Sequence, residues 1–485
     1  MPTYVDVGAV RVQQFIARWT KLRGRRNASA LLAWATSNEA IDPVLALWGG
    51  VRLHGEAGDV DGVVSVVLDA GAPTAEVVAG VLLDHLRDTV PGCDLEALWG
   101  DGDDYVSAYT NELGPRRAAG DVLVSLPIRR EIPVVAACHA TEVDPAVTDR
   151  KIPGDEEANT RRVGFDVAAQ LDLPSDLATR ARHQLVVSLG LVDNAQGVAK
   201  DPFPETFEAL ARLGPKKPRD ESLGERELKR NHLATVFADG NGMGAFFAKL
   251  VKEQSPSKTE VSKACNAAAQ AGLKAGLAAA GYKADGSTSP VIPHVVAGDD
   301  LLVSVPAYLG IRFVQAYLTE FAAHIRNAVT GIAEEHGDQV LQTMLAEGGL
   351  PTASAALVFA NQTQPFADIV RLAADRLRSA KELVQGQEAS VAWMDVTREG
   401  HVPRPGAVAK LADLAIDVET IKATAALPRS LQHRLLLESA RTDKMLSDAA
   451  VRVVLARDGK SEFAEALTTS RIGAVSILDL ARWWA

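Results

Sequence analysis

The chain contains few of the residues and patterns that mark secreted, zinc-bound or membrane-embedded proteins. It has three cysteines in 485 residues, Cys93, Cys138 and Cys265, and no CxxC pair that would hold a structural zinc ion. Aromatic residues make up only 5% of the sequence, and no apolar run approaches the ~20 residues of a bilayer-spanning helix. The first residues, MPTYVDVGAV, lack the order of a signal peptide. We therefore expect a cytoplasmic protein without membrane contact.

Positive charge is also in short supply, since the formal net charge is -11. This balance argues against indiscriminate binding of nucleic acid, because phosphate contacts need clustered Lys and Arg. Two stretches are nevertheless basic: residues 18–26, RWTKLRGRR, carry five positive charges and no acid, and residues 212–219, RLGPKKPR, are also rich in Lys and Arg. Each stretch is either a solvated surface or a local contact to RNA or a partner.

The length exceeds what one hydrophobic core usually organises, which predicts several domains. Residues 1–135 combine Val-rich alternating runs with helical stretches and predict an α+β unit. Residues 136–230 are polar, Pro-rich and partly helical, as expected for a connector. Residues 231–400 predict a second α+β unit, and residues 401–485, with apolar residues at helical spacing, predict a small helical bundle.

The second unit has the predicted order β-α-α-β-β-α-β-α-β. Its first strand, HLATVFAD, ends in a turn, and its second and third strands meet at GDD in SPVIPHVVAGDDLLVSVPA. Asp239 therefore lies at a strand end, and Asp299 and Asp300 lie at a hairpin turn. If the strands are neighbours in one sheet, the three carboxylates converge. Such a cluster can hold Mg²⁺ ions that bind a triphosphate and an attacking oxygen.

The segment after the first strand reads DGNGMG. Gly240, Gly242 and Gly244 would let the backbone approach phosphate, and the following helix would offer free N–H groups at its start. The same dipeptides, DG and NG, are common in ordinary tight turns, and GDD in a hairpin can be a turn without function. From these residues alone, both interpretations stay open.

The combination of motifs resembles a known family. A strand ending in ADGNGMG, a helix and a GDD hairpin are similar to the second palm domain, of the nucleotidyl cyclase type, in the large subunit of type III CRISPR effector complexes. GLPTASAALVFANQTQPFADIVRLAADRLRSAKE resembles that family's Ser-Ala strand and its helix with an Ala-Lys ending. VDVGAVRVQQFIARWTKLRGRRNASALLAWATS looks like the start of its first palm domain.

The resemblance implies two ferredoxin-like palm domains of the GGDEF type, the first non-catalytic and the second catalytic. Asp239, Asp299 and Asp300 match the catalytic aspartates that hold two Mg²⁺ or Mn²⁺ ions. Ser354 matches a serine near the nucleotide, and Lys381 matches a lysine that can meet the triphosphate. The alternatives are an ordinary strand residue for Ser354 and a solvated helix end for Lys381. With these two, Gly240, Asn241, Gly242 and Gly244 complete the predicted nucleotide-binding set.

The implied activity converts ATP into cyclic oligoadenylate messengers for RNA-guided antiviral defence. The implied partners are the other subunits of the ribonucleoprotein, the guide RNA and the target RNA, which would switch synthesis on. The basic stretch 18–26, the connector and the helical tail would face RNA or neighbouring subunits. Two alternatives stay open, a stand-alone palm cyclase that makes cyclic dinucleotides and a catalytically silent scaffold.

The sequence departs from the family pattern at several places. It contains no His-Asp dipeptide, so we expect no single-stranded DNA cleavage by an HD nuclease domain, and the connector lacks the ligands for zinc. Asn241 stands where the family frequently has a second acid, and it could coordinate a metal through its carbonyl without adding charge. The hairpin reads AGDD rather than GGDD. In the first unit, Asp6 has no GDD partner, and WGDGDDYVSAY at 99–109 is interpreted as an acidic loop.

Overall fold

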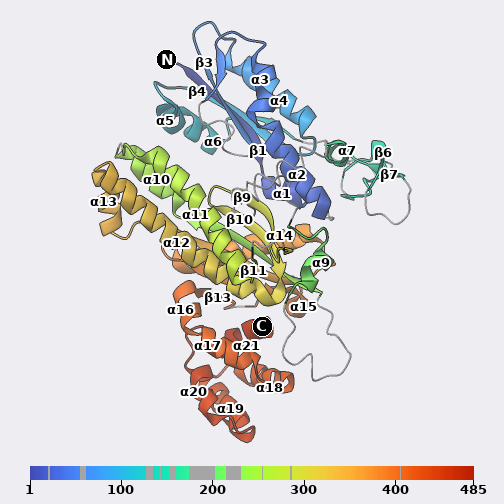
Figure 1. Cartoon of the computed structure of the whole chain (residues 1–485), viewed down its shortest axis with the longest axis vertical. Helices are drawn as coiled ribbons and strands as arrows, with labels where there is room; N and C mark the ends of the chain where they lie inside the picture. Colours follow the sequence, from blue (N-terminus) through green and yellow to red (C-terminus); the bar gives the residue numbers. More distant parts are fainter. Residues whose placement is uncertain are drawn as a thin grey trace. The chain divides into compact units, whose positions relative to one another are not determined.

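The computed structural model of the chain describes residues 1–19, 22–54, 62–126, 135–142, 144–152, 160–173, 202–214, 231–253, 255–283, 287–404 and 406–484. The chain divides into two compact units, Met1–Asp201 and Pro202–Ala485, and each contains a large β-sheet (Figure 1). Within the described ranges, no helix combines the length and the apolar character needed to cross a bilayer.

The first unit is built on an antiparallel sheet with the order β2-β3-β1-β4-β5. Valines dominate β1 and β3 because branched side chains suit a pleated, buried surface, and Val5, Val7, Val64 and Val66 have no exposed area. The order β2-β3-β1-β4 is that of a ferredoxin-like fold, which confirms the predicted fold class. The elements are β1 (Thr3–Val10), α1 (Val12–Ala17), α2 (Leu22–Ala35), α3 (Asn38–Leu45), β2 (Val51–Leu53), β3 (Val63–Leu68), α4 (Ala75–Thr89), β4 (Asp94–Asp101), α5 (Tyr105–Ala108), η1 (Tyr109–Leu113), α6 (Gly114–Ala119), β5 (Leu123–Ser125), β6 (Thr148–Lys151), β7 (Thr160–Val163) and α7 (Phe165–Asp172).

The interpretation of residues 99–109 as an acidic loop is wrong. Residues 99–101 belong to β4, which pairs with β1 along its whole length, and Asp101 accepts a hydrogen bond from Thr3 Oγ1. Asp104 then caps α5, where its side chain and that of Ser107 form a capping box. The acidic residues of this segment therefore end a strand and begin a helix.

The basic stretch 18–26 lies partly inside the first unit. Arg18 forms ion pairs with Asp144 and Asp166, and all three side chains are largely buried. Arg25 is 1% exposed, and its Nε donates to a backbone carbonyl at 2.9 Å. The expectation that this stretch faces RNA is therefore wrong for Arg18 and Arg25, because buried guanidinium groups serve the fold.

The connector is described only in part. Residues 174–201 and 215–230 of the connector, which include basic residues of the stretch 212–219, lie outside the described residues. Cys138 is buried in an apolar cluster with Ile152 and Val163, whereas the neighbouring His139 is exposed. The two side chains therefore occupy different environments rather than one polar site.

The second unit is built on a sheet with the order β13-β12-β11-β8-β10-β9, in which only β11 and β12 are parallel. The order β9-β10-β8-β11 repeats that of the first unit, and from β8 to β12 the succession follows the prediction with η3 and α13 added. Strand β13 comes from residues 401–485, for which only helices are predicted, because it pairs with β12 as an edge strand. The elements are α9 (Phe207–Arg212), β8 (His232–Asn241), α10 (Met243–Lys252), α11 (Lys258–Ala279), β9 (Ile292–Ala297), β10 (Asp300–Pro306), η3 (Ala307–Leu309), α12 (Gly310–Glu335), α13 (Gln339–Ala346), β11 (Thr352–Asn361), α14 (Phe366–Val384), β12 (Ser390–Asp395), α15 (Val396–Glu399) and β13 (Val408–Lys410).

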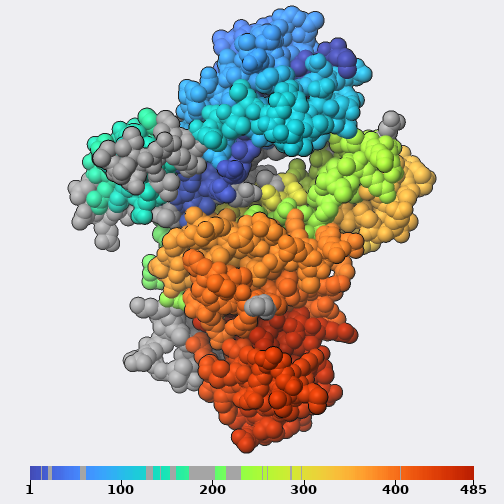
Figure 2. All heavy atoms as spheres, turned by 180° about the vertical axis from the view of Figure 1, so that it is seen from behind, coloured from blue at the N-terminus to red at the C-terminus, as the bar shows by residue number. Residues whose placement is uncertain are grey.

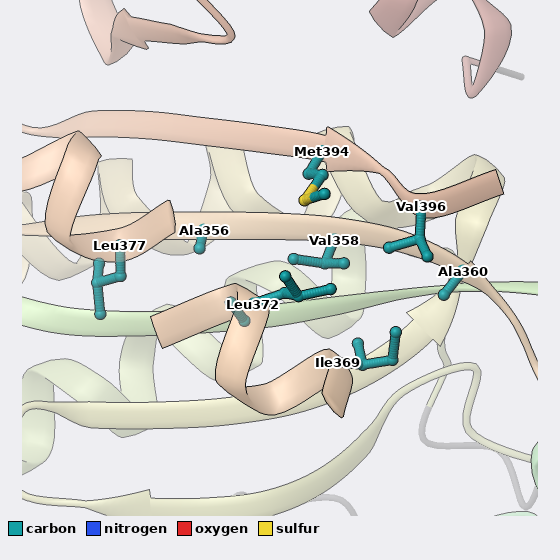
Figure 3. Packing of buried hydrophobic residues seen from close by; sticks show 9 residues of the cluster. Ala356, Val358, Ala360, Ile369, Leu372, Leu377, Met394 and Val396 are labelled. Atoms are coloured by element: carbon teal, nitrogen blue, oxygen red, sulfur yellow. The ribbon is translucent and has the colours of Figure 1, made fainter. Parts of the chain in front are cut away.

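Helices cover both faces of this sheet. Figure 3 shows Ile369, Leu372 and Leu377 of α14 packed against strand residues such as Val358 and Met394, all of them buried. This arrangement explains the apolar spacing of α14, since positions on one helical face meet the sheet. The residues of the cluster are Ala356, Val358, Ala360, Ile369, Leu372, Ala373, Leu377, Met394 and Val396.

The opposite face is covered by α12, which approaches the sheet closely at its first residue. A Cβ atom at Gly310 would lie 2.7 Å from the side chain of Ala234 in β8. The Ala-rich helix α11 packs against α12 with similar closeness, because Cβ atoms at Gly272 and Gly276 would collide with the rings of Tyr317 and Phe313. Small residues thus allow the helices to sit tightly behind the central strand β8.

The C-terminal helices, red in Figure 2, pack against the end of the sheet where β8 begins and β12 ends. The ring of Trp483 stacks on Phe359 of β11 with centroids 5.2 Å apart and lies 5.0 Å from His232. Its Nε1 donates to Asp395 Oδ2 at 3.0 Å. The helices are α16 (Leu411–Ile416), α17 (Val418–Ala425), α18 (Arg429–Ser439), α19 (Lys444–Arg457), α20 (Ser461–Thr468) and α21 (Ala474–Arg482).

Asp395 joins the sheet to the C-terminal helices. It caps α15 through Thr397 N, and it also accepts from Trp483 and from Arg482 at 3.0 Å. We predict that Asp395→Ala lowers the free energy of unfolding by about 3 kcal/mol, because a cap is lost and a buried N–H loses its acceptor. Urea unfolding followed by tryptophan fluorescence measures the change.

The matched control is Asp443→Ala, since Asp443 is also a helix cap but is exposed and accepts from Leu446 N. Its removal should cost about 1 kcal/mol. Equal losses in the two variants would mean that Asp395 acts only as a cap.

Candidate active site

Asp239 lies near the C-terminal end of the central strand β8. On one side, Ser354 of β11 is its partner in the register. On the other side, β10 runs antiparallel and pairs Leu301 with Ala238, so Asp300, one residue earlier, adjoins Asp239. The structure therefore brings together carboxylates that are about sixty residues apart in sequence.

The hairpin between β9 and β10 presents Asp299 at its tip. Its two-residue turn is Gly298 and Asp299, and the backbone of Ala297 pairs with Asp300. Gly298 has φ +61°, the left-handed conformation that a type II′ turn requires at its first central residue. The AGDD sequence thus forms a regular tight turn whose second residue carries the carboxylate.

The three carboxylates interact directly. The side chain of Asp239 lies close enough to Asp299 and Asp300 to raise the pKa of both. Burial, the largest cause, and the charges of Asp239 and Asp299 together raise the pKa of Asp300 to about 7, whereas Lys381 opposes the shift. The pKa of Asp299 is raised by the same causes, with burial first. The site therefore holds more acid groups than it can ionise at neutral pH without a cation.

Lys381, in the last turn of α14, supplies a positive charge at this cluster. Its Nζ forms an ion pair with Asp239 Oδ2 and donates to the carbonyl oxygen of Gly240 at 2.8 Å. Both side chains are about one-third exposed. As the side chains stand, the described residues contain no group of three or more His, Cys, Asp or Glu that is arranged to hold a metal ion. The lysine ammonium is the cation that meets Asp239.

The three glycines predicted to approach phosphate have different local reasons. A Cβ atom at Gly240 would lie 2.4 Å from Asp299 Oδ2, so glycine leaves room for the carboxylate. Gly242 has φ +70° and caps the start of α10. At Gly244 a Cβ would meet nothing within 4 Å, so that position faces open space next to the first turn of α10. The N–H groups of this first turn have no partner within the helix.

Asn241 and Ser354 are buried beside the carboxylates. Asn241 is 1% exposed and Ser354 has no exposed surface. The Nδ2 of Asn241 lies within hydrogen-bond distance of Thr352 Oγ1, Ser354 Oγ and the Glu388 carbonyl, at 3.0, 2.9 and 2.8 Å, and its two hydrogens are shared among these three acceptors. Its Oδ1 is also buried and finds no hydrogen-bond partner among the described residues. In this conformation, both side chains contact the protein rather than open space.

A hollow of about 500 Å³ opens beside Asp239 and Lys381, a size that suits a small ligand. It lies between β8 and the last turns of α14 and includes the cationic side chain of Arg378. The lining residues are Phe237, Asp239, Ala374, Leu377, Arg378, Lys381, Glu382, Gln385 and Gly386. Cations and carboxylates therefore share one accessible surface.

The first strand of the first unit also carries a carboxylate, but in another position and with another use. Asp6 lies in the middle of β1, is 4% exposed, and accepts hydrogen bonds from Ser65 Oγ at 2.6 Å and Tyr105 Oη at 2.8 Å. The pKa of Tyr105 is raised by burial first and by Asp6 second. Both oxygens of Asp6 thus serve the fold. Residues 55–61, in the connection between β2 and β3, lie outside the described residues.

Sequence reasoning missed two side chains of the second-unit site, Thr352 and Ser390. Ser390, at the start of β12, lies 2.8 Å from Ser354 Oγ and donates to the Ala380 carbonyl at 2.7 Å. A polar residue at the start of the strand SVAWMD, before four apolar residues, was the available signal. Its meaning depends on the pairing of β11 with β12, which the local sequence does not reveal.

Comparison with solved structures finds extended but distant similarity. The chain is similar to the Csm1–Csm4 cassette in complex with AMPPNP, at 14% identity with a TM-score of 0.48, and to the cassette in complex with cA4, at 13% with 0.46. Each match covers 99% of this chain and 69% of the other. A type III-B Cmr-beta structure in the apo state matches at 10% identity and a TM-score of 0.45, over 94% of this chain and 77% of the other.

Among curated proteins, none matches the sequence significantly. A family model is more specific, because residues 232–390 match the Cas10/Cmr2 second palm domain. The match begins with β8 and ends at the start of β12, so it contains Asp239, Asp299, Asp300, Ser354 and Lys381. This segment therefore belongs to the Cas10/Cmr2 family as its second palm domain, as the resemblance of its motifs predicts.

Proposed function

We propose that the chain is the large palm subunit of a type III CRISPR effector complex and converts ATP into cyclic oligoadenylates. The observation that carries this proposal is the convergence of Asp239, Asp299 and Asp300 at one edge of a second palm domain. In the proposed reaction, the 3′-oxygen of one ATP bonds to the α-phosphorus of another. The bond from that phosphorus to the pyrophosphate oxygen breaks, and the hydroxyl proton passes to solvent.

The donor set fits Mg²⁺ or Mn²⁺. Carboxylate oxygens are the ligands that these hard cations prefer, and Gly240 leaves the space that Asp299 needs beside β8. Protons and Lys381 relieve the repulsion among the acids in the metal-free protein, and divalent cations can do the same. Asp239, Asp299 and Asp300 would hold two ions. When bound, such ions neutralise a triphosphate and acidify the attacking hydroxyl.

The chain's own cationic and N–H groups suit the triphosphate. Lys381 and Arg378 border the hollow beside Asp239, and the first turn of α10 offers N–H groups at Gly244. Lys381 Nζ has three hydrogens and donates to Asp239 and to the Gly240 carbonyl, so its third hydrogen can meet a phosphate while the contact with Asp239 stays in place. Positioning and charge neutralisation are the main contributions that a protein makes to phosphoryl transfer.

The proposed partners follow from the family of the second palm domain. Guide RNA, target RNA and neighbouring subunits would contact this chain, and target RNA would switch on synthesis. The burial of Arg18 and Arg25 removes part of the basic stretch 18–26 from such a surface. RNA contacts are therefore expected from basic groups other than these two.

A further prediction concerns activity. With ATP and Mn²⁺ or Mg²⁺, the purified complex should form cyclic oligoadenylate in the presence of RNA that matches the guide, as mass spectrometry of the products would show. Changing Asp299 and Asp300 together to Asn should lower the rate at least about 100-fold, because catalysis depends on charge neutralisation at the triphosphate.

Asp368→Asn, in the first turn of α14 and therefore at the end of the helix away from Lys381, is the control and should leave the rate unchanged. Product formation without RNA would favour a stand-alone cyclase. Absence of product in every condition, with no difference between the variants, would favour a silent scaffold and overturn the proposal.

Another prediction concerns the stability of the metal-free protein in EDTA. The pKa of Asp300 is about 7 in the folded protein, above its ordinary value, so the folded state binds a proton more tightly than the unfolded state. The metal-free protein should therefore lose stability as pH rises from about 4 to about 7. Asp300→Asn should remove most of this loss and stabilise the protein at pH 8 by about 2 kcal/mol, measured by urea unfolding.

Adding Mn²⁺ should stabilise the natural chain at pH 8 and leave Asp300→Asn nearly unchanged, because ligand binding to the folded state adds stability. Asp368→Asn again serves as the control and should follow the natural chain. An unchanged pH dependence in Asp300→Asn would show that another group causes it.

A further inference from the structure

We propose that Asn241 is a positioning residue whose amide begins a directed hydrogen-bond chain through Ser354 and Ser390 that holds Lys381 against Asp239. This inference rests on the proposed function for its meaning in catalysis. It replaces the expectation that Asn241 is itself a ligand for metal or nucleotide.

The direction of donation along this hydrogen-bond chain follows from its last acceptor, the carbonyl of Ala380. Ser390 Oγ donates to the Ala380 carbonyl at 2.7 Å, because a carbonyl oxygen can only accept. Ser390 has then used its single hydrogen, so Ser354 must donate to Ser390 across 2.8 Å. Ser354 has in turn used its own hydrogen and accepts from Asn241 Nδ2 at 2.9 Å. Each link therefore requires the one before it.

The orientation of the Asn241 amide is fixed independently. Its Nδ2 lies 2.8 Å from the Glu388 carbonyl, which must face a donor. An aspartate at this position would set a carboxylate oxygen against that carbonyl and could not donate to Ser354. The Oδ1 of Asn241 is buried, so it is not open to an ion or a nucleotide. A neutral donor is thus the group that the surroundings demand.

This hydrogen-bond chain ends at the carbonyl of Ala380, one residue before Lys381. Ala380 and Ser390 have no exposed surface, so the bond between them ties α14 to β12 within the core. Asn241 lies two residues after Asp239 on β8, and alternate strand residues share one face of the sheet. These hydrogen bonds therefore connect the strand that carries Asp239 to the helix turn that carries Lys381. They run through the interior of the protein rather than through solvent.

Labelling of Lys381 in EDTA tests this inference without metal or ATP. The full chain is treated with a small amine-acetylating reagent, and the rate of modification at Lys381 is followed by mass spectrometry of peptides. Ser390→Ala and Asn241→Asp should each raise this rate about fivefold, the factor by which one hydrogen bond typically shifts an equilibrium. Both variants loosen the hold of Lys381 on Asp239.

Ser304→Ala is the matched control, because Ser304 is equally buried in the same sheet but bonds to His294 instead. It should leave Lys381 labelling unchanged even if it lowers the melting temperature. Unchanged labelling in Ser390→Ala and Asn241→Asp, or an equal increase in Ser304→Ala, would overturn the positioning role. If the natural chain makes no oligoadenylate, the proposed function fails while this labelling result stands.

A second measurement connects this series of hydrogen bonds to catalysis. Ser390→Ala should lower kcat/KM for ATP in the natural chain and have no further effect in a Lys381→Met background, because both changes act through the same side chain. A destabilising substitution without a positioning role would reduce kcat/KM by the same factor in both backgrounds, which would overturn the inference.

Discussion

Electrostatic repulsion among three carboxylates, at neighbouring ends of strands β8 and β10, is the constraint on which the rest of the second unit depends. Burial raises the pKa of Asp299 and Asp300, and Asp239 lies close enough to raise both further. An arrangement of this kind is tolerated only where protons or cations balance it. Lys381 provides one such cation, and the buried contacts of Asn241, Ser354 and Ser390 support its place. Additional cations would reduce the electrostatic repulsion between these carboxylates, so the site favours their binding.

The fold and the main carboxylates could be predicted because their signals are local. Alternating Val-rich strands and a two-residue turn at GDD mark a hairpin wherever the hairpin later packs, and Gly298 adopts the left-handed conformation that such a turn needs. Assigning Lys381 required family resemblance, since a lysine near a helix end is usually solvated. The structure adds the partner that periodicity cannot supply, Asp239 on another element.

What could not be predicted depends on contacts between distant residues. The five charges of residues 18–26 look alike in sequence, yet Arg18 is neutralised by acids more than a hundred residues away. Ser390 gains its role from the pairing of β11 with β12, which no local pattern encodes. The segment 99–109 was misjudged because its Gly and Asp residues resemble a loop, although β1 pairs with β4 through Asp101.

The two sheets show how one topology separates stability from chemistry. In the first unit, Asp6 lies in mid-strand, where hydroxyl donors satisfy it completely. In the second, Asp239 lies close to one end of β8, and His232 at the other end packs on Trp483. Seven residues separate His232 from Asp239, which at 3.3 Å per residue is about 23 Å. The C-terminal helices therefore stabilise the sheet at the end away from the carboxylates. Repulsion at the site can be tolerated because that stabilising contact does not involve the acids.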